Sequence, residues 1–231
     1  QWNPSAADGL AIWSDERNTD NDVYGYDLDT QTEIIISNAT GNQVPGDTDA
    51  RTVVWYQTGV ATTEPDVYGY DLSTQATSPI CTAPAGQINP TVSGRYVVWQ
   101  DSRAASNNQD IYGYDLVSGT EFPVSTAAGS QVAPAIHSDI VVWMDYRNEP
   151  DPGCWPDCKT DIYGYDLSTG TEFPICTDAS SQAHPAIHGD TVVWLDHRNG
   201  NWDIYGYDLT TNQEFAVSLE PTDQIAVTLN E

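Results

Sequence analysis

Val23-Tyr-Gly-Tyr-Asp-Leu28 is the first of five copies of one hexapeptide in this 231-residue chain. The other copies begin with Val or Ile and keep the remaining five residues; they start at residues 67, 111, 162 and 204. The copies therefore recur every 42–51 residues. A period of this length is the sequence signature of a repeat architecture in which each unit is one supersecondary structure.

Each hexapeptide lies within a longer repeated unit. An apolar stretch such as Val-Val-Trp precedes every copy, and a Gln followed by Pro lies further upstream. A Ser/Thr/Gly turn and a short strand, such as residues 119–125, follow it. Each unit thus holds four short strands, which predicts an all-β fold: a single, closed, five-bladed β-propeller domain over residues 1–231 with four antiparallel strands per blade.

The predicted blades span roughly residues 1–41, 42–85, 86–129, 130–180 and 181–223. Residues 224–231 begin with Gln224, a sixth copy of the opening Gln. This segment is predicted to close the ring beside the first blade or to be a surplus strand. A surplus strand offers self-association with a neighbouring subunit.

The repeat also carries a family resemblance. The pattern Gln-x-x-Pro, Val-Val-Trp-x-Asp-x-Arg-Asn, Asp-Ile-Tyr-x-Tyr-Asp-Leu and Glu-x-Pro-Ile resembles TolB-like propeller repeats, and most closely those of archaeal and bacterial cell-surface proteins. It covers essentially the whole chain. It implies a cell-envelope or extracellular location and no specific activity, since one propeller fold hosts many functions.

A charged pair recurs after the Trp of four blades. We expect each Arg to be held between carboxylates across the hairpin of the second and third strands, with its stem on aromatic rings. We interpret the pairs as structural; the second blade has Tyr56, Gln57 and Thr58 in their place. The pairs are Asp15/Arg17, Asp101/Arg103, Asp145/Arg147 and Asp196/Arg198.

The overall charge narrows the classes of partner. Seven basic and 34 acidic residues give a formal charge of −27. Such a surface repels nucleic acid and anionic membranes, and no stretch is apolar enough for membrane insertion. Cofactors are not expected. Calcium binding by Asp-x-Asp pairs is an open alternative, although no complete calcium-loop pattern is present.

The loops between second and third strands vary most, and binding usually resides in variable loops on a rigid scaffold. Trp155 and Trp202 lie there, outside the repeated Trp position. Exposed Trp with nearby Asn suits a glycan or a protein partner. The candidate ligand-binding residues are Trp155, Trp202, Asn148, Asn199 and Asn107.

The cysteines and one sequon fit an oxidising compartment. Cys154 and Cys158 lie four residues apart in the longest loop, where a local disulfide is expected. Cys81 and Cys176 occupy equivalent places in two fourth strands and are interpreted as small buried residues. Asn38 begins a candidate glycosylation sequon.

The predicted function is a non-enzymatic binding module for glycan or protein at the cell surface. The alternatives are a self-assembling structural subunit of a surface layer or filament and, third, a polysaccharide-active enzyme. No catalytic constellation stands out from the repeats, which disfavours an enzyme. A zinc site near His184, His188 and His197 is conceivable, but turn and surface roles are preferred, so no metal site is predicted.

Overall fold

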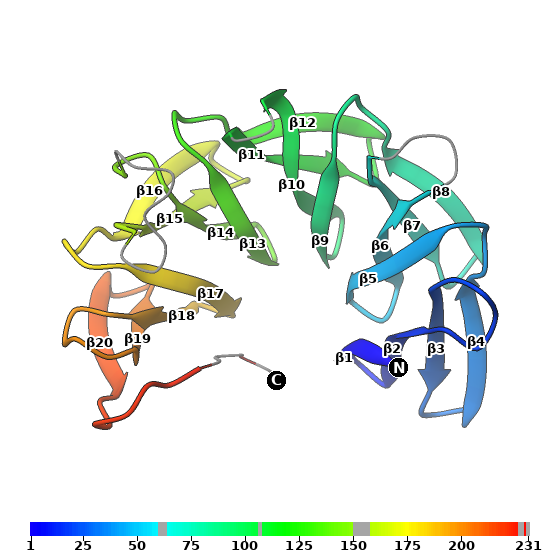
Figure 1. The fold of residues 1–231 in the computed structure, drawn as a ribbon, viewed down its shortest axis with the longest axis horizontal. Coiled ribbons are helices and arrows are strands. Elements are labelled where there is room, and N and C mark those ends of the chain that lie inside the picture. The colour runs from blue at the N-terminus through cyan, green and yellow to red at the C-terminus, as the bar shows by residue number, and fades with distance from the viewer. Residues whose placement is uncertain (60–63, 106–107, 150–157, 226–228, 230–231) are drawn as a thin grey trace. The chain divides into compact units, whose positions relative to one another are not determined.

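The structure is a computed structural model that describes residues 1–59, 64–105, 108–149, 158–225 and 229. These residues form strands and turns and contain no helix. Consecutive strands pair in antiparallel fashion into sheets of four, each in the order of the chain (Figure 1). The predicted all-β, five-bladed propeller with four antiparallel strands per blade is confirmed.

Each sheet is one blade, and we call its strands A to D in chain order. The first three blades are β1 (Trp2–Ala7), β2 (Leu10–Asp15), β3 (Asp22–Asp27) and β4 (Thr32–Ser37); β5 (Asn42–Thr48), β6 (Thr52–Thr58), β7 (Asp66–Asp71) and β8 (Ala76–Cys81); and β9 (Gln87–Ser93), β10 (Tyr96–Ala105), β11 (Asn108–Asp115) and β12 (Thr120–Ser125). The last two are β13 (Gln131–His137), β14 (Ile140–Asp145), β15 (Asp161–Asp166) and β16 (Thr171–Cys176); and β17 (Gln182–His188), β18 (Thr191–Asp196), β19 (Asp203–Asp208) and β20 (Gln213–Ser218).

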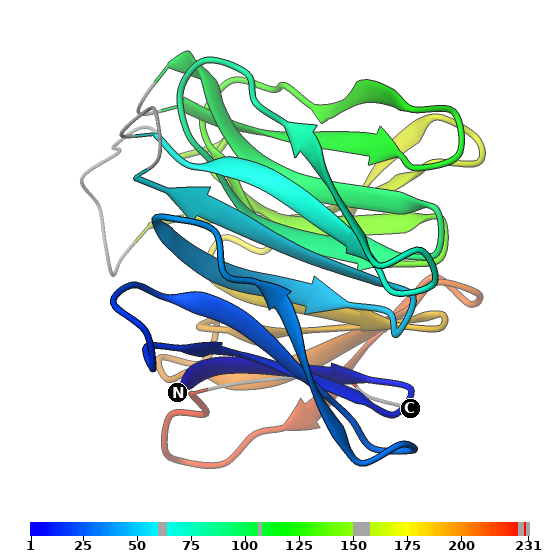
Figure 2. The same ribbon diagram turned by 90° about the vertical axis from the view of Figure 1, so that its right-hand side faces the viewer.

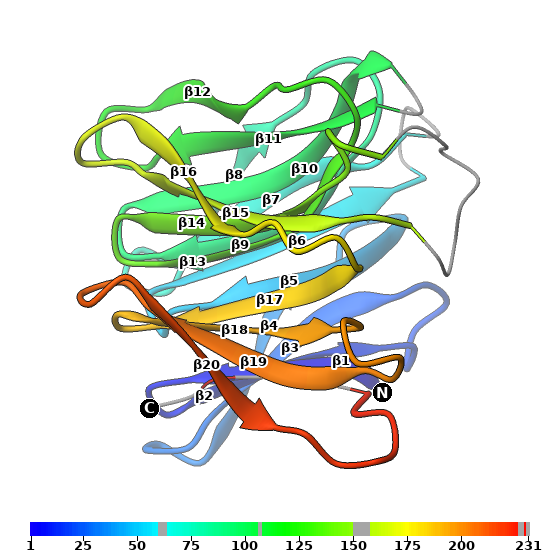
Figure 3. The same cartoon turned by 90° about the vertical axis from the view of Figure 1, so that its left-hand side faces the viewer.

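The blades fall into two compact units. The first unit comprises blades 1 and 2 and most of blade 3, and the second comprises blades 4 and 5 with the rest of blade 3. Blades 1 and 2 lie face to face within the first unit (Figure 2), as do blades 4 and 5 within the second (Figure 3). Closure of all five blades into one ring stays a prediction.

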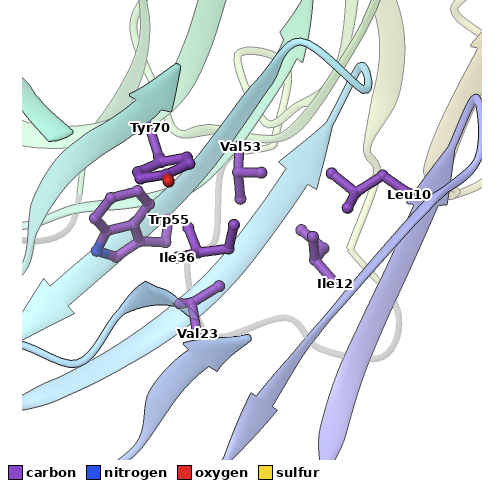
Figure 4. Close-up of a cluster of buried hydrophobic side chains, with 7 residues drawn as sticks. All are labelled: Leu10, Ile12, Val23, Ile36, Val53, Trp55 and Tyr70. Carbon is purple, nitrogen blue, oxygen red and sulfur yellow. The ribbon is translucent and has the colours of Figure 1, made fainter. Parts of the chain in front are cut away.

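Apolar side chains fill the space between neighbouring blades. Between blades 1 and 2, Ile12 and Val23 face Val53 and Trp55, and all four side chains are fully buried (Figure 4). Such sandwiched sheets bury both faces of a blade only through their neighbours. This explains why aromatic and β-branched residues occupy both faces of the strands.

A buried glutamine marks each internal junction. Gln43, Gln87, Gln131 and Gln182 open strand A of their blades and are fully buried. The backbone N–H of Gln87 donates to the carbonyl of Pro65 in the preceding blade, at 2.8 Å, and its side chain donates to the carbonyl of Ala85. Gln224 repeats both contacts, with the carbonyls of Trp202 and Thr222. The sixth opening Gln thus takes the position of a blade start.

The central Gly of strand C makes room for a side chain of its own blade. A Cβ on Gly164 would lie 2.7 Å from Cζ of Phe173, and Gly164 is paired with Phe173 across β15 and β16. Gly113 and Gly206 face Phe122 and Phe215 in the same way. At these three positions the nearest atom belongs to the Phe ring of strand D and not to a Trp of the adjacent blade. In blades 1 and 2 an Ile of strand D lies near the Gly instead.

Candidate functional site

The repeated Asp and Arg form a clamp inside each blade, seen clearly in blade 4. Nε1 of Trp143 donates to Asp145 at 2.8 Å, and Nε and Nη2 of Arg147 donate to the same carboxylate at 2.9 and 2.7 Å. The Arg147 guanidinium lies 3.9 Å from the centre of the Tyr163 ring. Nη1 of Arg147 reaches Glu172 on β16 at 2.6 Å. The clamp thus ties strands B, C and D together and satisfies the buried Asp145.

The same clamp occurs in blades 1, 3 and 5, and it corrects one expectation. We expected both carboxylates to lie on the hairpin of strands B and C. The guanidinium instead lies over the Tyr ring of strand C and reaches the Glu of strand D. The four Arg–Glu pairs are Arg17–Glu33, Arg103–Glu121, Arg147–Glu172 and Arg198–Glu214.

Blade 2 has no clamp. Trp55 is fully buried, and its Nε1 has no hydrogen-bond partner among the described residues. Gln57 stands where the other blades have the clamp Asp, and burial raises the pKa of Asp66 above its usual range. This blade lacks the charged network that stiffens the other four.

The Asp of Tyr-Asp-Leu caps the following turn. In blade 4 the Oδ1 atom of Asp166 accepts the backbone N–H groups of Ser168 and Thr169, at 2.8 and 3.2 Å. The Ser168 hydroxyl and these backbone N–H groups lower the pKa of Asp166. This Asp therefore caps the turn, and calcium binding by Asp-x-Asp pairs stays an open alternative. Among the described residues, no group of three or more His, Cys, Asp or Glu could hold a metal ion.

Cys81 and Cys176 are free and buried. Nη2 of Arg103 donates to Sγ of Cys81 at 3.2 Å, and Arg198 contacts Cys176 in the same way at 3.3 Å. Burial raises the pKa of each thiol to about 12. The thiols therefore pack beside the clamp of the next blade.

Some of the predicted ligand-binding residues brace their own hairpins, and others lie outside the described residues. The side chain of Asn148 donates to Asp161 at 2.7 Å, and that of Asn199 donates to Asp203 at 2.7 Å. Both amides thus brace their own hairpins. Trp155, Asn107 and Cys154 lie outside the described residues, so the Cys154–Cys158 disulfide stays a prediction; Cys158 itself is buried. Asn38 is exposed directly after β4, and its glycosylation stays a prediction.

Trp202 lies in a pocket of about 210 Å³ on blade 5. Its backbone N–H donates to Oδ1 of Asp223 at 2.9 Å, and its carbonyl accepts the N–H of Gln224 at 2.7 Å. The His197 ring lies 5.0 Å from the Trp202 ring. The hydrogen bonds hold the backbone of Trp202, and the His197 ring packs beside its side chain. The pocket is lined by Ala183, His184, Leu195, Trp202, Asp223, Gln224 and Ile225.

Backbone geometry aims His184 into this pocket. β17 shifts register between Ala183 and Ala186, and His184 within this bulge has a φ of 52°. A bulge re-aims a side chain relative to a regular strand. The residue is therefore exposed although its neighbours Ala183 and Pro185 are buried. The pocket combines one aromatic face, an imidazole, a carboxylate and an amide.

The sequence predicted Trp202 as a binding residue but not the other residues that line its pocket. Asp223 and Gln224 belong to the turn that precedes the sixth blade opening, and the repeat alone could have placed them beside Trp202. The bulge at His184 leaves no signal in composition, because Asn89 and Ala133 adopt the same conformation in other blades.

No family model matches the chain, and no curated protein matches it. Solved structures do. TolB from Acinetobacter baumannii is 14% identical with a TM-score of 0.63; the match covers 96% of this chain and 55% of TolB. The fold is that of a TolB-like β-propeller. No helix in the described part of the chain is long and apolar enough to cross a membrane.

The chain is also similar to solved structures of proteins with other names. Oligogalacturonate lyase from Vibrio parahaemolyticus is 13% identical, with a TM-score of 0.65 and coverage of 92% of this chain and 63% of the lyase. A structure of a nidogen/laminin complex is 11% identical, with a TM-score of 0.58 and coverage of 91% and 76%. This chain spans 55% and 60% of the two TolB structures that it matches. At these identities the likeness shows the fold alone.

Proposed function

We propose that this propeller is a non-enzymatic, extracellular or cell-surface binding module that takes a neutral saccharide in the Trp202 pocket. The observation that supports the proposal is the position of Trp202 in a concave site that is also lined by His184, Asp223 and Gln224. Aromatic faces pack on the apolar faces of sugar rings, and the amide, imidazole and carboxylate are hydrogen-bonding groups for hydroxyls.

The negative charge of the chain favours some classes of saccharide over others. A formal charge of −27 disfavours acidic polysaccharides through long-range repulsion. The ligand class is therefore a neutral or amino-bearing glycan and not a polyuronate. This choice also separates the chain from the lyase fold relatives, whose substrate is named as oligogalacturonate.

A glycan array followed by calorimetric titration of the strongest ligand tests the proposal. We expect Trp202→Ala to weaken binding at least about tenfold, because a buried aromatic contact commonly contributes more than 1.4 kcal/mol. Trp2→Ala, which removes a 43% exposed Trp of blade 1, is the matched control and is expected to bind normally. Equal weakening by both variants, or no glycan above background, contradicts the proposal. Cleavage of a bound polysaccharide contradicts its non-enzymatic part.

A second candidate function is self-assembly through the terminal blades. Val217 on β20 is 53% exposed, whereas its equivalents Ile36, Ile80, Val124 and Ile175 are 4–7% exposed. Blade 1 shows the complementary exposure, since Gln1 and Pro4 are exposed where other blades bury the same residues. These are the two kinds of face that pack together at the internal junctions. A second copy that docks tail to head would cover both, and sedimentation over a range of concentrations tests this.

A further inference from the structure

Two histidine side chains lie close together where the A strands of blades 4 and 5 end. His137 ends β13 and His188 ends β17, and their ring centres lie 4.5 Å apart with the ring planes tilted by 59°. Both side chains are partly exposed. Blades 1 to 3 have no His at all, so the pair is a departure from the repeat and not part of its construction.

The separation of the rings matches shared coordination. A metal–nitrogen bond of about 2.1 Å puts the ion about 3.2 Å from an imidazole centre, so two rings on one ion lie about 4.5–5.2 Å apart for bond angles between a right angle and the tetrahedral value. The observed 4.5 Å falls in this range. The tilt of 59° shows that the two rings do not stack face to face.

The surroundings favour a cation. Asp139 and Asp190 follow the two histidines at a distance of two residues, and both are exposed. The carbonyls of these two residues accept the N–H groups of Leu167 and Leu209, which anchors the two turns to their own blades. The positions of the histidines are therefore fixed by two rigid hairpins.

We propose that His137 and His188 form a binding site for one divalent transition-metal ion, such as Zn²⁺, Ni²⁺ or Cu²⁺. Imidazole nitrogen selects these ions over Ca²⁺ and Mg²⁺, which prefer oxygen. Two protein ligands leave the other coordination positions to water, since no third His, Cys, Asp or Glu of the described residues joins them. The ion links strand A of blade 4 to strand A of blade 5. Its binding therefore also stabilises the packing of these two blades.

Titration of the tag-free protein with Zn²⁺ alone, in excess Mg²⁺ to occupy surface carboxylates, tests the site. We expect one tight ion per chain, at least about tenfold weaker binding in His137→Ala and in His188→Ala, and unchanged binding in His184→Ala. The last variant removes an exposed His from the same strand, β17. Circular dichroism checks that all variants are folded.

A second readout does not depend on the stoichiometry. Ligand that binds only the folded state raises the thermal midpoint, so Zn²⁺ should raise it in the wild type and in His184→Ala but not in the other two variants. Electron paramagnetic resonance of the Cu²⁺ form should show two imidazole nitrogens. Equal Zn²⁺ affinity in wild type and His137→Ala, or loss of binding in His184→Ala, overturns the proposal.

Discussion

At the scale of single residues, the clamps account for most of the positive charge of the chain. Four of its seven basic residues hold an Asp and a Glu within one blade. Asp101, Asp145 and Asp196 are fully buried, and each accepts hydrogen bonds from both Trp and Arg. A buried carboxylate of this kind is tolerated only when it is paired and fully hydrogen-bonded. The conspicuous charged motif is therefore structural.

The two free thiols give a residue-scale prediction with a definite sign. Burial raises the pKa of Cys81 and Cys176 to about 12, so both are protonated in the native protein at pH 8. Because the thiolate is the reactive form, we expect no reaction with a disulfide reagent until denaturant is added. Their stabilising contribution is present below the unfolded pKa of about 8.5 and is lost as the pH rises toward 12.

Absorbance during reaction with Ellman's reagent measures both states. The Cys81→Ala variant is the control, because it should release one reactive thiol fewer on unfolding. Rapid modification of the native wild type at pH 8 contradicts the predicted burial of these thiols.

At the scale of the strands, the Gly of strand C differs between blades. A Cβ at Gly164 meets the Phe173 ring at 2.7 Å, whereas at Gly25 the nearest atom is Cδ1 of Leu10 at 3.4 Å, an ordinary contact. We expect Gly164→Ala to lower the free energy of unfolding by about 1–3 kcal/mol through overpacking. Gly25→Ala should be neutral or slightly stabilising, since Gly weakens a strand interior.

Urea unfolding monitored by Trp fluorescence measures both variants. Equal effects at the two positions would show that backbone conformation, and not the Phe ring, explains the glycine.

The strands and turns were largely predictable because the same sequence pattern occurs five times. Gln, Trp and Tyr-Gly-Tyr-Asp-Leu recur in the same order in every unit, so strand order and turns follow from the repeat. Contacts across strands were less predictable. The Arg17–Glu33 pair joins the loop after strand B to strand D, 16 positions further on, and no local spacing distinguishes Glu33 from Asp22 as the partner. The His184 bulge and the His137–His188 contact likewise depend on how two strands meet.

At the scale of the whole molecule, the terminal blades decide whether copies associate. Val217 and Phe215 on β20 are 53% and 42% exposed. If a second copy covers this face, sedimentation coefficients should rise with protein concentration in the wild type, and Val217→Lys should abolish the rise by burying an unpaired charge. Val117→Lys, at a turn position that is 74% exposed, should associate like the wild type.

A wild type that stays monomeric at every concentration contradicts the assembly candidate. Closure of the ring within one chain would be a different way to cover the blade 5 face. The saccharide proposal is independent of this outcome, because all residues that line the Trp202 pocket come from blade 5 and the segment that follows it.

We infer that the residues that belong to the repeat build the blades, whereas residues that depart from it bind the ligand. The indole N–H signals of the eight Trp residues in a ¹⁵N-labelled sample test it most directly. We predict that a bound neutral saccharide shifts the signal of Trp202, assigned with a Trp202→Phe variant. The signals of Trp13, Trp99, Trp143 and Trp194, which donate to Asp, should stay in place. An unmoved Trp202 signal at saturating saccharide, or movement of the four clamp signals instead, would contradict the account.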